Sequence, residues 1–214
     1  MHRDDTVTHL AYRTGLKKHT TIYKHNPEYP RLKTLFKIMP RIDSSIVFAG
    51  NSLTRDCNWA EFFQNPRIRV RGIGGDCAAG ILERIDEILT PPPQKIFFEI
   101  GGSDLGDYYT PEEILRNYEK IIDTSRARSP GVGIFLQSLL PLSEELAPPT
   151  NKEIVQFNKE IVALAHKKGC VFIDLHPLFV NSAGTLDTVY SNDGVHLNGR
   201  AYAKWKQAIE RYVR

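Results

Sequence analysis

The chain has 214 residues, of which 41% are hydrophobic and 25% are charged, as expected for a soluble globular protein with a sizeable core. Its formal net charge is only +3, and the Lys and Arg residues are dispersed, which excludes the basic surface typical of a nucleic-acid-binding protein. No apolar run approaches the length of a membrane span, and the first residues lack the apolar core of a signal peptide. We therefore expect no nucleic-acid or membrane partner. A cytoplasmic location is the default, or a secreted or periplasmic one if a leader has been removed.

The first part of the chain predicts a polar arm that precedes the domain. Residues 1–25 are rich in Thr, His and Lys and show no periodicity, which is typical of an extended segment outside a core. Residues 26–214 contain no repeat, low-complexity tract or linker, so we expect them to form a single domain. Apolar residues between Pro30 and Met39 recur at helical spacing and predict the first helix.

Five short apolar segments predict buried strands: residues 46–49, a strand that begins at Ile68 and ends at Gly72, then residues 95–100, 133–140 and 171–175. Helices are predicted near residues 81–89, from Thr110, after Thr150 and from about Gly199. The run Thr110-Pro111-Glu112-Glu113 is a strong helix start, since Thr110 can cap the helix and Glu113 can complete a capping box. Short apolar strands that alternate with helices predict an α/β fold, a three-layer α/β/α sandwich around a five-stranded parallel sheet.

Ser52 is the first candidate for a functional residue. It follows the strand at 46–49 after Gly50 and Asn51, and open α/β sheets bind ligands at the carboxyl ends of their strands. A lone serine there is usually a turn residue or a helix cap. Asp193 and His196, three residues apart on a late loop, should reach the same edge of the sheet. A serine, an imidazole and a carboxylate that converge there match the logic of an activated nucleophile.

Two other patterns allow different interpretations. Asp174 and His176 form a rival acid–histidine pair after the last strand, for which a structural role is favoured. The run Gly72–Cys77 resembles a dinucleotide-binding fingerprint, but Cys77 occupies its third glycine position and the run follows the second strand, which disfavours that interpretation.

Three cysteines cannot all pair within one chain. Buried thiols are the default, and a disulfide between Cys57 and Cys77 is the alternative.

Four blocks, in order and spacing, resemble the SGNH (GDSL-type) family of serine esterases and acylhydrolases. They are Gly50-Asn51-Ser52-Leu53, Gly74-Gly75-Asp76, Gly101-Gly102-Ser103-Asp104 and Asp193-Gly194-Val195-His196-Leu197-Asn198. The resemblance runs from about Ile46 to about Trp205, and it is greatest with the branch that contains acetylhydrolases of carbohydrates and small esters. It implies a flavodoxin-like fold, no metal and no organic cofactor.

The resemblance also implies roles for single residues. Ser52 would be the nucleophile, His196 the general base, and Asp193 the acid that orients His196. The oxyanion hole would consist of the backbone N–H groups of Ser52 and Gly75 and the side chain of Ser103. Two positions depart from the family's commonest pattern: Asn51 replaces an Asp, and Ser103 replaces an Asn whose longer side chain offers an amide donor.

We therefore expect a metal-independent serine esterase that removes short acyl groups, in the first place acetyl, from a carbohydrate or another small alcohol. A lysophospholipase or thioesterase of the same family is one alternative, and a weakly active or non-catalytic glycan-binding module is another. The partner would be a small-molecule or glycan ester. The alcohol half of the substrate and the oligomeric state, a homodimer included, stay open.

Overall fold

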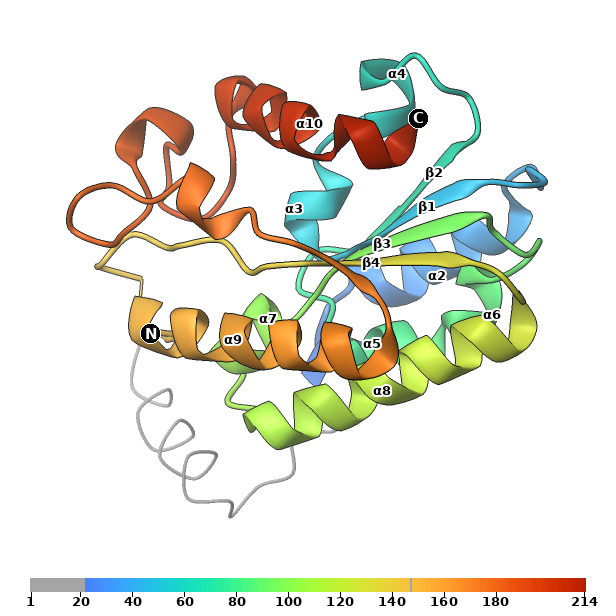
Figure 1. Ribbon diagram of the computed structural model, residues 1–214, viewed down its shortest axis with the longest axis horizontal. Helices are drawn as coiled ribbons and strands as arrows, with labels where there is room; N and C mark the ends of the chain where they lie inside the picture. Colours follow the sequence, from blue (N-terminus) through green and yellow to red (C-terminus); the bar gives the residue numbers. More distant parts are fainter. Residues whose placement is uncertain (1–21, 147) are drawn as a thin grey trace.

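The computed structural model describes residues 22–146 and 148–214 (Figure 1). The predicted polar arm therefore lies outside the described residues as far as residue 21. Its last four residues, Ile22–His25, form a 3₁₀ helix (η1), and Tyr23 is only 4% exposed. The Tyr23 ring packs edge-on against Tyr29, with 4.8 Å between the ring centroids. The expectation of an arm without a place in the core is therefore wrong at Tyr23.

A five-stranded parallel sheet forms the centre of the fold, as predicted. Its strands are β1 (Ile46–Gly50), β2 (Ile68–Gly72), β3 (Lys95–Glu99), β4 (Gly133–Gln137) and β5 (Val171–Ile173), in the order β2-β1-β3-β4-β5. In the sheet register Gly50 at the end of β1 pairs with Gly72 on one side and with Glu99 on the other. The loops that follow β1, β2 and β3 therefore open onto one edge, at the point where the strand order reverses and ligands commonly bind.

Helices cover both faces of this sheet (Figure 1). They are α2 (Glu28–Ile38), α3 (Ser52–Arg55), α4 (Trp59–Phe62), α5 (Ala78–Glu83), α6 (Ile85–Ile88), α7 (Gly102–Gly106), α8 (Pro111–Arg128), α9 (Asn151–Lys168) and α10 (Gly199–Val213), with short 3₁₀ helices η2 (His176–Leu178) and η3 (Thr188–Tyr190). The predicted capping box at Thr110 and Glu113 is present. The helix predicted near residues 81–89 is two short helices, α5 and α6, with Arg84 between them. The fourth and fifth strands end at Gln137 and Ile173, earlier than predicted.

Two apolar clusters, one on each face, fill the space between sheet and helices. Val47 and Ala49 belong to the cluster under α5, α8 and α9, whereas Ile46 and Phe48 belong to the cluster under α3, α4 and α10. This alternation along β1 follows from the two-residue period of a strand. The predicted three-layer sandwich is thereby confirmed. Among the described residues no helix is both long and apolar enough to cross a membrane.

Candidate active site

Ser52 lies at the first position of α3, directly after the tight end of β1. A Cβ on Gly50 would come within 2.4 Å of the Glu99 carbonyl oxygen and of Thr54 Oγ1, so only glycine fits there. Asn51 has an extended backbone, and its side-chain oxygen accepts a hydrogen bond from Leu53 N at 2.9 Å, which caps the helix. As the first helical residue, Ser52 has a backbone N–H without an acceptor inside the helix. The sequence thus presents a hydroxyl and an N–H at the same edge.

The structure brings Ser52, His196 and Asp193 together, although 144 positions separate the first two. His196 Nε2 lies 3.0 Å from Ser52 Oγ, and His196 Nδ1 lies 2.7 Å from Asp193 Oδ2. With Nδ1 donating to the carboxylate, Nε2 is left as the acceptor for the Ser52 hydroxyl. This is the geometry of a serine nucleophile, a base and an orienting acid.

Backbone groups hold Asp193 in place. Its Oδ1 accepts hydrogen bonds from the N–H groups of Val195 at 2.9 Å and His196 at 2.7 Å. The hydrogen bond from the His196 side chain and those from these N–H groups lower the pKa of Asp193 well below its usual range, so it is a carboxylate at neutral pH. The side chains of His196 and Asp193 are 45% and 55% exposed, so water can reach the imidazole directly.

Gly75 lies on the loop after β2, where φ is +66°, in the left-handed region that favours glycine. Buried carboxylates fix this loop. Asp76 accepts from Cys77 N at 2.9 Å and from Arg84 Nε at 2.9 Å, and Asp104 accepts from Ala78 N at 2.9 Å. Because these carboxylates occupy the N–H groups at the start of α5, a phosphate has no place there. The dinucleotide interpretation of this run is therefore not supported.

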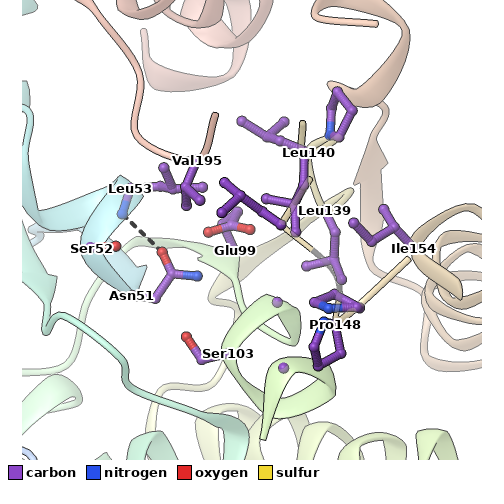
Figure 2. A pocket seen from close by; sticks show the side chains of 16 residues that line it. Asn51, Ser52, Leu53, Glu99, Ser103, Leu139, Leu140, Pro148, Ile154 and Val195 are labelled. Atoms are coloured by element: carbon purple, nitrogen blue, oxygen red, sulfur yellow. Dashed lines mark hydrogen bonds between the residues drawn. The ribbon is translucent and has the colours of Figure 1, made fainter. Parts of the chain in front are cut away.

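Ser103 is the second residue of α7 and lines the same pocket as Ser52. In Figure 2 it lies below Asn51, with its hydroxyl turned toward the Asn51 side of the pocket. Its part in an oxyanion hole, together with the N–H groups of Ser52 and Gly75, stays a prediction.

The pocket beside Ser52 has a volume of about 280 Å³ and a largely aliphatic wall. Asn51, Ser52, Glu99 and Ser103 are its polar side chains. The aliphatic wall consists of Leu53, Leu139, Leu140, Pro141, Leu142, Leu146, Pro148, Pro149, Ile154 and Val195. Figure 2 shows Leu53 and Val195 close to Ser52, and Leu139, Pro148 and Ile154 on the far side.

Glu99, the last residue of β3, is a feature of this pocket that the sequence reasoning missed. It is 1% exposed, and its Oε2 has no hydrogen-bond partner among the described residues. Burial raises its pKa to about 8, and a side-chain hydrogen bond with Asn51 partly opposes this shift. At neutral pH Glu99 is therefore mainly a neutral acid. The signal in the sequence was a single carboxyl within the otherwise apolar run Ile96–Ile100.

Glu99 also accounts for Asn51, one of the two departures from the family pattern. The amide oxygen of Asn51 accepts from Leu53 N, which leaves the amide nitrogen as the group that can donate to Glu99. An Asp at position 51 would place a second carboxyl group against a buried one.

The rival pair, Asp174 and His176, does not reach Ser52. Both residues line a separate small cavity near α9, with Asn158 and Phe172, and this cavity shares no lining residue with the pocket beside Ser52. Burial lowers the pKa of His176, and its Nε2 is buried without a hydrogen-bond partner among the described residues.

Cys57 and Cys77 are free thiols, so the alternative of a disulfide between them is wrong. Cys57 belongs to the cluster under α3, α4 and α10, whereas Cys77 belongs to a third, smaller cluster with Tyr23, Tyr29, Phe36 and Ile73. Burial raises the pKa of Cys57 to about 11, which makes it an inert structural thiol. Within the described part of the chain, no group of three or more His, Cys, Asp or Glu side chains is placed to hold a metal ion.

Comparison with known proteins identifies a family, a relative and two similar structures. Residues 44–204 match the GDSL-like Lipase/Acylhydrolase family. Platelet-activating factor acetylhydrolase IB subunit alpha1 of Pongo abelii is 29% identical over 175 residues, which cover 78% of this chain and 74% of that protein.

Two solved structures resemble the fold. A protein from Streptococcus pneumonia, named for platelet activating factor, gives a TM-score of 0.81 at 27% identity over 87% of this chain and 93% of that one. Axe2, an acetylxylan esterase from Geobacillus stearothermophilus, gives a TM-score of 0.67 at 15% identity over 81% and 95%, which is a likeness of fold alone.

Proposed function

Because the chain belongs to the GDSL-like lipase/acylhydrolase family, we propose that it is a metal-independent serine esterase. It removes short acyl groups, acetyl among them, from a carbohydrate or another small alcohol. The observation that carries this proposal is the continuous chain of contacts from Asp193 through His196 to Ser52, with 2.7 Å and 3.0 Å between the bonded atoms.

The reaction would proceed in two halves. Ser52 Oγ attacks the ester carbonyl carbon while His196 Nε2 takes the hydroxyl proton, and the N–H groups of Ser52 and Gly75 meet the developing oxyanion. The C–O bond to the alcohol breaks, and His196 returns its proton to the leaving oxygen. A water then attacks the acyl-enzyme with His196 again as the base, which releases the carboxylic acid and restores Ser52.

Two observations support the acyl and alcohol groups that we name. The Pongo abelii relative is an acetylhydrolase by name, and it is similar over 78% of this chain. The imidazole of His196 is 45% exposed, so an alcohol half that remains in solvent can be hydrophilic and large.

A panel of esters tests this proposal. Acetyl, butyryl, octanoyl and palmitoyl esters of one alcohol, with acetylated sugars beside them, should show hydrolysis that falls for the longest chains. Ser52→Ala should abolish hydrolysis of every member while far-UV circular dichroism stays that of the wild type, because a half-buried serine at a helix start contributes little packing. Full hydrolysis by Ser52→Ala would refute the proposal.

A second candidate is a thioesterase or lysophospholipase of the same family. The pocket of about 280 Å³ with its aliphatic wall favours it, since that volume corresponds to roughly nine water molecules and exceeds what an acetyl group fills. The same panel, extended with thioesters and a lysophospholipid, separates the two candidates. A non-catalytic glycan-binding module would bind acetylated sugars without hydrolysing any member of the panel.

A further inference from the structure

The pocket beside Ser52 contains a polar group that the proposed chemistry does not use. Glu99 is the only ionisable side chain among its described lining residues, and it is 1% exposed. In Figure 2 its carboxyl group lies in the middle of the pocket, between Leu53 and Leu139. One oxygen, Oε2, has no hydrogen-bond partner among the described residues. A buried, unpaired oxygen is unfavourable and is rare in folded proteins, so Oε2 calls for a partner from outside the chain, which a group of the substrate in this pocket can supply.

We propose that this pocket is a specificity site for acyl groups that carry a hydroxyl group, and that Glu99 recognises the hydroxyl. The inference rests on the proposed function, and it names the substrate class of that same site.

The chemistry of the wall assigns the pocket to the acyl half of the ester. Leucine and proline side chains give a hydrocarbon chain a surface to bury against. A sugar would leave many of its hydroxyls unpaired against that wall, which is costly. An acyl chain with a single hydroxyl matches an aliphatic pocket in which one buried carboxyl oxygen, Glu99 Oε2, has no partner among the described residues.

The state of Glu99 favours a hydroxyl over an ammonium group. Burial raises its pKa to about 8, so near neutral pH it is mainly a neutral acid that can donate one hydrogen bond and accept others. A hydroxyl offers the complementary donor and acceptor. An ammonium would need an ionised Glu99, and hence a buried ion pair whose desolvation is expensive.

Size agrees with this assignment. The volume of about 280 Å³ exceeds an acetyl group, so a chain of several carbons can extend from Ser52 toward Glu99. The neighbours of Ser52 and His196 in sequence, Leu53 and Val195, line this pocket and lie close to Ser52 (Figure 2).

Binding to Ser52→Ala tests the inference apart from turnover. The probes are two matched pairs of methyl esters, butyrate with 3-hydroxybutyrate and hexanoate with 6-hydroxyhexanoate, titrated by NMR at pH 7. In at least one pair we expect the hydroxy ester to bind about tenfold tighter or more. In Ser52→Ala/Glu99→Leu this preference should fall to within about twofold, because the plain ester should bind more tightly and the hydroxy ester less tightly than in Ser52→Ala. Ser52→Ala/Glu99→Gln, which keeps a donor and an acceptor, should retain a preference.

Three outcomes would overturn the inference. The first is equal affinity within both pairs in Ser52→Ala. The second is a preference that survives Glu99→Leu in a variant that circular dichroism shows to be folded. The third is tighter binding of glyceryl monobutyrate than of methyl butyrate, with the difference removed by Glu99→Leu. This result would place the alcohol half of the ester, and not the acyl half, in the pocket. Hydrolysis of the probes by Ser52→Ala itself, visible in the same spectra, would instead refute the proposed function.

Discussion

Glu99 and Asn51 illustrate how one buried carboxyl group changes the requirements of its neighbour. Glu99 is 1% exposed, and its neutral form costs less to bury than a carboxylate would. The amide of Asn51 can donate to Glu99 through its nitrogen while its oxygen caps α3. The protonated state of Glu99 is therefore part of the folded structure, with a consequence for stability.

That consequence is a pH dependence that Glu99→Gln should reduce. The pKa of Glu99 is about 8 in the folded protein against 4.5 ordinarily, so the folded state holds a proton that the unfolded state releases. Between these two values the free energy of unfolding falls as pH rises, by up to ~1.4 kcal/mol per pH unit for one proton. Urea unfolding from pH 5 to pH 8 should show a flatter profile for Glu99→Gln than for the wild type.

A smaller slope of the same sign should remain in that variant. Burial raises the pKa of Asp104 to about 7 and that of Asp107 to about 6. The contribution of both groups to the free energy of unfolding therefore also falls as pH rises. Glu145→Gln, in an exposed loop, is the matched control and should keep the wild-type profile. Parallel profiles for wild type and Glu99→Gln would mean that Glu99 is ionised in the folded protein.

Ser103 should limit the rate of ester hydrolysis. A short hydroxyl reaches less far than an amide, and the loss of one oxyanion donor typically costs on the order of a hundred- to a thousandfold in rate. Ser103→Asn should therefore raise kcat on a simple acetyl ester at least several-fold, without a matching change in KM.

Ser103→Ala is the control, and we expect it to be slower than the wild type. If Ser103→Ala is as active as the wild type and Ser103→Asn is no faster, position 103 takes no part in stabilising the oxyanion.

At the scale of elements, a buried ion pair links the loop after β2 to Arg84, between α5 and α6. Arg84 Nη2 lies 2.8 Å from Asp76 Oδ2, and both side chains are fully buried. Arg84 also donates to the Arg71 carbonyl oxygen at 2.6 Å, which ties the loop to the end of β2. Gly75, next to Asp76, is held in place through these contacts.

Asp76→Ala should lower the free energy of unfolding by ~3–5 kcal/mol, because it removes the closer of the two carboxylates that pair with the buried Arg84 guanidinium and leaves only Glu87, at 3.6 Å. The matched control is Asp86→Ala on α6. Asp86 pairs with Arg128 at the surface, where its side chain is 80% exposed, and the loss there should stay below ~1 kcal/mol. Chemical unfolding of both variants at one pH measures the difference, and similar losses would contradict a structural role for the buried pair.

At the scale of the whole molecule, most of the fold could be predicted from the sequence. The parallel sheet follows from short apolar strands between helices, and the start of α8 follows from the capping box that Thr110 and Glu113 form. These signals are local, because a strand or a cap depends on residues within a few positions. The order of the motif blocks likewise indicated that Ser52, Asp193 and His196 would meet at one edge.

What the sequence did not reveal depends on contacts between distant segments. Glu99 is 1% exposed and lines a pocket together with residues of α3 and of the segment after β4, which no local pattern around Glu99 indicates. Tyr23 looked like part of a polar arm, yet its hydroxyl donates to Glu83 at 2.7 Å, 60 positions away. Arg84, with a backbone at φ −108° and ψ 17°, divides a helix that periodicity had joined, and its side chain donates to Asp76, eight positions earlier.

The identity of the nucleophile is tested most directly by labelling with a fluorophosphonate ester, followed by intact-mass measurement and peptide mapping. We predict one adduct per chain, on Ser52. His196→Ala should slow the labelling strongly, because His196 Nε2 lies 3.0 Å from Ser52 Oγ, whereas His176→Ala should label as fast as the wild type. An adduct on another residue, or equal loss of labelling in the two histidine variants, would contradict the assignment of Ser52 and His196.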